Sequence, residues 1–117
     1  MYVGSVVIDC SDFDAMFAFW TGALRYVPRE PPEDGWVVLC DPDGLHVNVS
    51  LQRVPERRAG KNRLHLDLYT DEPVGEVARL VALGARRHPR TAKPGEDFVS
   101  LLDPEGNVFD VIDRSGG

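Results

Sequence analysis

A fourteen-residue segment occurs twice in this chain, and the repeat limits the folds that the chain can adopt. Residues 36–49 (WVVLCDPDGLHVNV) align with residues 98–111 (FVSLLDPEGNVFDV) at a constant offset of 62, with six of the fourteen positions identical. A strand-like run followed by a helical pattern precedes each copy, at residues 3–24 and at residues 63–83. Such self-similarity indicates two copies of one supersecondary unit.

Helix signals occur at the same place in both halves. The apolar residues of the first helical segment recur at i, i+3, i+4, i+7 and i+11, which forms one face of a helix: Phe13, Met16, Phe17, Trp20 and Leu24. Asp12 is placed to cap this helix, and Trp20 is expected in a core or an interface. Pro73 suits the first position of the second helix, and Gly84 suits its end.

Two Asp-Pro-x-Gly segments, Asp41–Gly44 and Asp103–Gly106, each join two apolar runs. Proline fixes one φ angle and glycine permits a positive one, so each segment predicts a hairpin turn. The Asp-x-Asp-Gly sequence of the first segment also occurs in calcium-binding loops. The further ligands and the closing glutamate of such a loop are missing here, which favours the structural interpretation.

Size and charge narrow the class of protein. The chain has 117 residues, 43% of them hydrophobic, which is enough for one core of ordinary size. A net charge of -6 argues against nucleic-acid binding. Five basic residues do cluster between 53 and 63, where either a solvated loop or an anion site is possible: Arg53, Arg57, Arg58, Lys61 and Arg63. Cys10 and Cys40 lie 30 residues apart, without the spacing of a metal site. The sequence shows neither an apolar span nor a leader, so we expect a cytoplasmic protein with no membrane contact.

Alternation along two predicted strands separates an apolar face from a polar one. Leu45, Val47, Val49 and Leu51 are expected to pack, as are Leu64, Leu66 and Leu68. The opposite faces carry two polar rows, His46, Asn48, Ser50 and Gln52, then Arg63, His65, Asp67 and Tyr69. Asp110 interrupts an apolar row in the last strand, so it needs a partner or a cavity, unless it is a solvated residue near a fraying end.

The chain resembles the glyoxalase/bleomycin-resistance/dioxygenase superfamily, also called the vicinal oxygen chelate superfamily. The two modules ending in Asp-Pro-Asp/Glu-Gly carry the likeness. The runs WVVL at 36–39, QRVPE at 52–56 and GKNRLHLDL at 60–68 are similar to an actinobacterial glyoxalase-like group. The resemblance implies an α+β fold with two tandem βαβββ modules, whose mixed sheet curves into a cup with helices outside. Residues 1–117 would form one domain, with module one at 1–52, a linker at 53–62 and module two at 63–117.

The resemblance also implies four positions that can hold a divalent metal, which here are Ser5, Asn48, His65 and Asp110. His65 and Asp110 are good ligands for Zn, Fe, Mn or Ni, whereas Ser5 and Asn48 are weak ones, so the site is half intact. His46 or Glu56 could supplement it. The incomplete ligand set argues against lactoylglutathione lyase activity, and extradiol dioxygenases need two histidines where this chain aligns one.

Two functions fit this pattern. One is a binder of a small organic molecule, with no metal or a degenerate site, lined by Trp36, Asn48, Ser50, Gln52, Arg63, Asp67, Tyr69 and Phe98. The other is a metal-dependent lyase, isomerase or epimerase in which His65 and Asp110 are catalytic or bind the metal. The resemblance implies a homodimer in either case. Hydrated sheet faces, a module without a ligand and a Ser5, His65, Asp110 hydrolytic triad stay open as minor alternatives.

Overall fold

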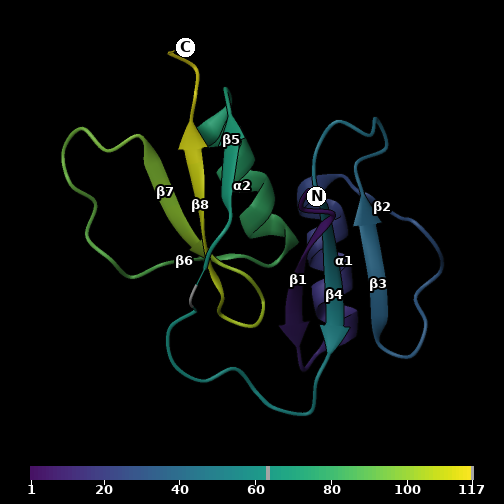
Figure 1. The fold of residues 1–117 in the computed structure, drawn as a ribbon. Helices are drawn as coiled ribbons and strands as arrows, with labels where there is room; N and C mark the ends of the chain where they lie inside the picture. The colour runs from purple at the N-terminus through teal and green to yellow at the C-terminus, as the bar shows by residue number, and fades with distance from the viewer. Residues whose placement is uncertain (63, 117) are drawn as a thin grey trace. The chain divides into compact units, whose positions relative to one another are not determined.

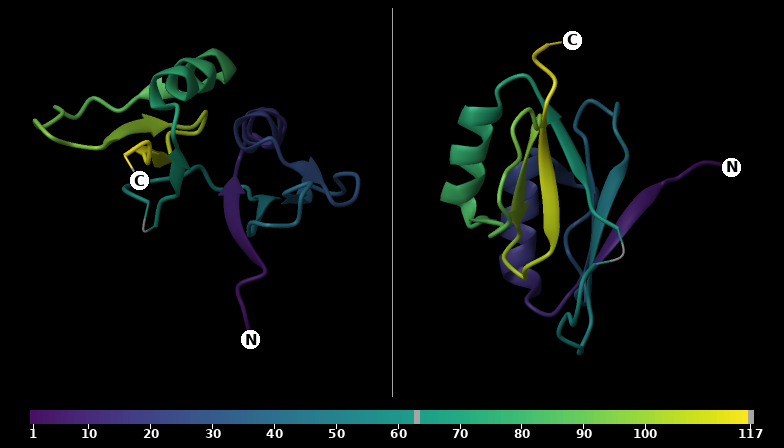
Figure 2. Two further views of the ribbon diagram at one scale, coloured as in Figure 1. Left: turned by 90° about the horizontal axis from the view of Figure 1, so that it is seen from above. Right: turned by 90° about the vertical axis from the view of Figure 1, so that its left-hand side faces the viewer.

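The computed structural model describes residues 1–62 and 64–116, and the chain divides into two compact units, Met1–Ala59 and Gly60–Gly117. Each unit consists of a strand, a helix and three further strands, and each helix lies along one face of its own sheet (Figures 1 and 2). The α+β class and the two βαβββ modules expected from the sequence are therefore confirmed.

The first unit contains β1 (Ser5–Cys10), α1 (Phe13–Leu24), β2 (Val27–Pro28), β3 (Trp36–Cys40) and β4 (Asn48–Arg53). Its strands form a mixed sheet in the order β1-β4-β3-β2, in which β1 and β4 are parallel. Asp12 caps α1, since its side chain accepts the Ala15 amide at 3.2 Å. Trp20 is fully buried and packs edge-on against Phe19, as expected of a core residue.

The second unit contains β5 (Asp67–Thr70), α2 (Pro73–Leu83), β6 (Arg86–Arg87), β7 (Phe98–Leu102) and β8 (Val108–Asp113). The strand order is β5-β8-β7-β6, with β5 and β8 parallel. Pro73 begins α2 and Gly84, at φ +121°, ends it. Val77 and Leu80 of the helix are buried, as are Leu101, Phe109 and Val111 of the strands. The apolar rows of β7 and β8 thus lie under the helix, and the alternate residues form the opposite face.

Both Asp-Pro-x-Gly segments are turns in which the aspartate accepts backbone amides. Asp41 accepts amides at 2.9 to 3.1 Å from Asp43, Leu45 and His46, and the Asp43 hydrogen bond is the main reason that the Asp41 pKa lies below its ordinary value. Asp103, which is fully buried, accepts the amides of Glu105 and Asn107 at 2.9 Å. These carboxylates therefore close the turns, in agreement with the structural interpretation of the motif.

Two strands begin later than the alternation predicts. β4 starts at Asn48, so Leu45 and Val47, which were expected to pack, are exposed. β5 starts at Asp67, and Leu64 is likewise exposed. The reason in the first case is Asp41, because its hydrogen bonds hold residues 43–46 in the turn and prevent them from joining the strand. Among the described residues, no helix is long and apolar enough to cross a membrane.

Candidate metal centre

Three potential ligands for a metal ion meet on the face of the second sheet that α2 does not cover. Asp67 begins β5 and Asp110 lies in β8, and the register of these parallel strands pairs the two residues directly. His65 lies two residues before Asp67. The amide of Asp110 donates to the carbonyl of Leu66 at 3.0 Å, so the segment that carries His65 already runs beside β8.

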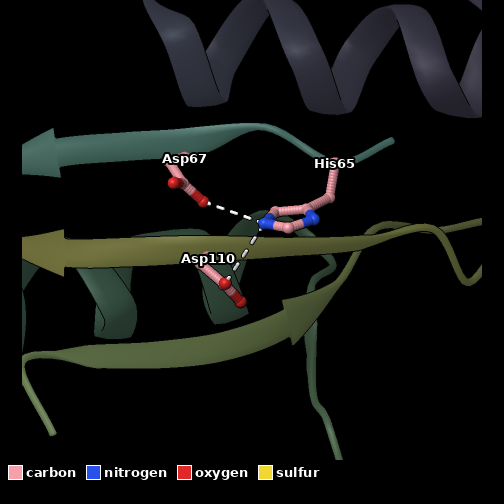
Figure 3. A group of neighbouring side chains, drawn as sticks. All are labelled: His65, Asp67 and Asp110. Carbon is pink, nitrogen blue, oxygen red and sulfur yellow. Dashed lines mark ion pairs between the residues drawn. The ribbon is translucent and has the colours of Figure 1, made fainter. Parts of the chain in front are cut away.

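The imidazole of His65 points between the two carboxylates (Figure 3). Its Nε2 atom lies 3.1 Å from Oδ1 of Asp67 and 3.5 Å from Oδ2 of Asp110. One ligand atom from each of the three residues lies within 4.8 Å of the others. His65 and Asp110 therefore point to the same side of the sheet, which any site that uses both of them requires.

A hydrogen bond from the neighbouring strand β7 fixes the carboxylate of Asp110. Ser100 pairs with Asp110 across β7 and β8, and its hydroxyl donates to Oδ1 of Asp110 at 2.6 Å. Ser100 is buried and the Asp110 side chain is 16% exposed, whereas His65 and Asp67 are 48% and 45% exposed. The site thus combines one fixed carboxylate with two ligands that are open to solvent.

This set of donors fits a divalent cation. Two ligands about 2.1 Å from one ion lie about 3.0 Å apart in octahedral geometry and about 3.4 Å apart in tetrahedral geometry, which matches both separations from His65 Nε2. Two carboxylates and a neutral imidazole carry a charge of -2, which balances the ion. Three protein ligands would leave positions open for substrate oxygens.

The first unit has two serines where the second has His65 and Asp110. The starts of α1 and α2 differ by 73 - 13 = 60, and those of β4 and β8 by 108 - 48 = 60, with the same register between parallel strands. His65 therefore corresponds to Ser5, and Asp110 corresponds to Ser50. These two hydroxyls lie 2.6 Å apart. Ser50 replaces Asn48 as the counterpart of Asp110, because the connection after β3 is two residues longer than the one after β7.

The other predicted ligand-binding residues fall into two groups. Trp36, Asn48, Ser50 and Gln52 lie in the first unit, on the sheet face that carries Ser5. Ser50 is fully buried, and Trp36 and Gln52 are exposed. Tyr69 and Phe98 lie in the second unit, on the same face as His65, Asp67 and Asp110, which are called the metal group below. Arg63 lies outside the described residues.

Two residues near this face carry no obvious signal in the sequence. The guanidinium of Arg90 lies 4.9 Å from the centre of the Phe98 ring and forms two hydrogen bonds with Glu96, at 2.6 and 2.9 Å. This pairing raises the pKa of Arg90, to which the negative charge of Asp110 also contributes, and it lowers the pKa of Glu96. The pair fixes the ends of the segment between them, residues 91–95, beside the sheet.

Sequence and structure comparisons agree with this fold. The family described as "Glyoxalase-like domain" matches residues 5–112. A glyoxalase/bleomycin resistance protein/dioxygenase family enzyme from Burkholderia phytofirmans PsJN has a TM-score of 0.78 at 19% identity, with 97% of this chain and 98% of that chain covered. A glyoxalase-related enzyme from Fulvimarina pelagi has a TM-score of 0.74 at 16% identity, with coverage of 97% and 88%.

A fosfomycin resistance protein, FosX from Listeria monocytogenes, has a TM-score of 0.75 at 14% identity, with 95% of this chain and 88% of that chain covered. At these identities the likeness establishes the fold alone. No curated protein matches the chain by sequence.

Proposed function

The chain belongs to the glyoxalase-like domain family, and from this premise we propose that it is a divalent-metal-dependent lyase, isomerase or epimerase acting on a small organic molecule. The convergence of His65, Asp67 and Asp110 on one point carries the proposal. The sequence alone indicates two good ligands in this module. With Asp67 as the third, the second unit contains enough ligands to hold a metal ion by itself. Asp67 was predicted to line the ligand site, and here it is proposed as a metal ligand too.

The ion would supply Lewis-acid chemistry, because a divalent metal polarises a carbonyl or hydroxyl oxygen and stabilises negative charge that develops on it. His65 and Asp67 are half exposed and would hold the ion at the surface where substrate arrives. Asp110 would fix its position, since Ser100 restrains one oxygen and leaves the other facing His65. The set contains two oxygen donors and one nitrogen donor, which suits Mn or Fe, and Zn and Ni remain in the proposal.

Manganese is the first ion to test. The crystal structure of a FosX mutant, one of the proteins that share this fold, contains Mn(II) and 1S,2S-dihydroxypropylphosphonic acid. Carboxylate ligands also favour Mn over softer metals.

A second candidate is a binder that works without a metal, and the first unit favours it. Ser5 and Ser50 bond to each other at the positions that correspond to His65 and Asp110, so this half of the usual ligand set is absent. The face that carries these serines also bears half-exposed Trp36 and Val7, which could contact an apolar ligand.

Metal content distinguishes the two candidates. The full chain, purified without chelator or affinity tag, would be analysed by elemental analysis and then titrated with Mn(II) by calorimetry. We expect close to one ion per chain, lost in His65→Ala and in Asp110→Asn. Asp71→Asn is a matched control, because Asp71 is an exposed carboxylate near the end of β5 and outside the group. No metal in the wild type and no heat of Mn(II) binding would refute the enzyme proposal in favour of the binder.

We further propose that two copies of the chain associate, as the resemblance to the superfamily implies. Light scattering during gel filtration would test it, because a dimer has twice the chain mass of 13.0 kDa. A mass near 13.0 kDa at high protein concentration would contradict the dimer and leave the metal proposal unaffected.

A further inference from the structure

An arginine and a tyrosine lie beside the metal group on the same sheet face. Tyr69 alternates with Asp67 along β5, so both side chains point away from α2, and Tyr69 is 67% exposed. The guanidinium of Arg114 lies over the Tyr69 ring, 4.8 Å from its centre. The backbone amide of Arg114 donates to the carbonyl of Thr70 at 2.8 Å, which holds the chain after β8 against the end of β5.

No carboxylate of the described residues neutralises the charge of Arg114. In residues 1–62 and 64–116, its guanidinium contacts the Tyr69 ring and meets no carboxylate. Arg90 on the same face differs, because its two hydrogen bonds to Glu96 already occupy the guanidinium. A guanidinium stacked on an aromatic ring keeps its N–H groups at the edge of the stack, where they can donate to an oxyanion in pairs.

The distance between Tyr69 and Asp67 suits a small ligand. Residues two apart on a strand are separated by about 7 Å, which is roughly the length of a small molecule. Ile112 pairs with Tyr69 across β5 and β8, which places an apolar side chain between Asp110 and Arg114. The face therefore has acidic ligands at one end, an aromatic and an apolar residue in the middle, and the guanidinium of Arg114 at the other end.

We propose that Arg114 and Tyr69 bind the anionic end of the substrate, a small organic molecule with a carboxylate or phosphonate at one end and metal-binding oxygens at the other. This inference rests on the proposed function for the metal-binding end only. The anion subsite is formed by Arg114 and Tyr69 themselves, so it operates in the metal-free chain.

The test uses the metal-free full chain, labelled with ¹⁵N and titrated with phenylphosphonate or phenylacetate while the arginine side-chain signals are followed by NMR. We expect a saturable shift of the Arg114 Nε–Hε signal. Arg114→Gln should weaken binding at least about tenfold, because it removes a charge-assisted pair of hydrogen bonds. Arg114→Lys should bind with intermediate affinity, since it keeps the positive charge but loses the planar guanidinium that donates two hydrogen bonds to one anion. The tighter of the two probes identifies the anion class.

Controls separate this subsite from general attraction of anions. Arg29→Gln removes the same charge from an exposed position in the first unit and should leave the affinity unchanged. Tyr69→Leu should bind more weakly than the wild type, because the ring face supports the guanidinium, and Tyr69→Phe, which keeps the ring, should restore most of the affinity. Equal weakening by Arg29→Gln and Arg114→Gln, or no shift of the Arg114 signal, would overturn the inference.

His65→Ala separates the two proposals. The metal-free variant should bind the probes as the wild type does, because His65 belongs to the other end of the face. A wild-type chain that binds no metal but shows Arg114-dependent probe binding overturns only the proposed function. A chain that binds Mn(II) but shows no Arg114-dependent probe binding overturns only the anion subsite.

Discussion

The hydroxyl of Ser100 donates a 2.6 Å hydrogen bond to Oδ1 of Asp110 and leaves Oδ2 of the same carboxylate facing His65. Ser100 therefore does not touch the ion in the proposed centre. It positions Asp110, the most buried of the three ligands, so that Oδ2 points toward the proposed ion. Such supporting hydrogen bonds strengthen metal sites because the ligand need not be ordered when the metal arrives.

Ser100→Ala should weaken Mn(II) binding by about tenfold, the lower end of what supporting hydrogen bonds contribute to metal sites. Ser100→Thr keeps the hydroxyl and should restore most of the affinity. Calorimetric titration with Mn(II) measures both variants. Unchanged affinity in Ser100→Ala would mean that the strand alone positions Asp110.

The hydrogen bond between Ser5 and Ser50 makes a prediction about stability that does not depend on function. Ser50 is fully buried, so Ser5→Ala should leave its hydroxyl without this partner and lower the free energy of unfolding by about 1 to 2 kcal/mol. The double variant, Ser5→Ala with Ser50→Ala, removes both polar groups and should cost less than the sum of the two single variants.

Urea unfolding of the wild type, both single variants and the double variant gives the coupling free energy. A coupling near zero would show that the two hydroxyls contribute independently, contrary to the hydrogen bond at 2.6 Å.

The internal repeat was sufficient to predict two halves of similar plan, because strand alternation, helix periodicity and turn residues all agree within each half, and the family resemblance added the α+β class and the βαβββ modules. Asp12, Pro73 and Gly84 were predicted at helix ends for the same reason. Local chemistry determines these features, so they can be deduced without knowing how distant segments pack.

The metal group depended on information that the sequence does not contain. His65, Asp67 and Tyr69 could be placed on one face from alternation alone, but the pairing of Asp67 with Asp110 depends on the register between β5 and β8. The family resemblance implied Asn48 as the counterpart of Asp110, in agreement with the ungapped alignment of the repeat. The longer connection after β3 shifts the counterpart to Ser50, and a repeat read without gaps cannot show such an offset.

Arg114 and Ser100 were missed for different reasons. Arg114 follows the last strand and reads as a solvated charge until its contact with the Tyr69 ring is seen. Ser100 stands in an apolar run, and a single hydroxyl there could equally bond to its own backbone. A small polar residue inside an apolar strand, on the strand next to a carboxylate of like orientation, is the signal that could have identified it.

The two Asp-Pro-x-Gly turns provide a matched comparison. Asp103→Ala leaves two backbone amides and the Asn107 side chain without their acceptor in a fully buried position, and should lower the free energy of unfolding by about 3 kcal/mol. Asp41→Ala removes the acceptor of three amides in a solvated turn, where water can replace it, so the loss should be clearly smaller. Urea midpoints of the two variants measure the difference, and equal losses would contradict the role of burial.

The ion pair between Arg90 and Glu96 predicts how stability depends on pH. The hydrogen bond from Arg90 lowers the pKa of Glu96 in the folded chain, so the folded state releases this proton more readily than the unfolded state. The stabilisation is therefore present above the ordinary glutamate pKa and is lost as pH falls through the lowered pKa of the folded state.

Glu96→Gln should consequently have a lower Tm than the wild type at pH 7, and the difference should shrink as the pH is lowered below about 4, the range of an ordinary glutamate. Differential scanning fluorimetry from pH 7 to pH 3 measures both chains, and salt should reduce the difference because both side chains reach solvent. Glu56→Gln, at an exposed position in residues 53–62, is the control and should follow the wild type at every pH. A Tm difference for Glu96→Gln that stays constant across this range would mean that its effect comes from packing, and that the ionised carboxylate of Glu96 does not stabilise the segment beside the metal group.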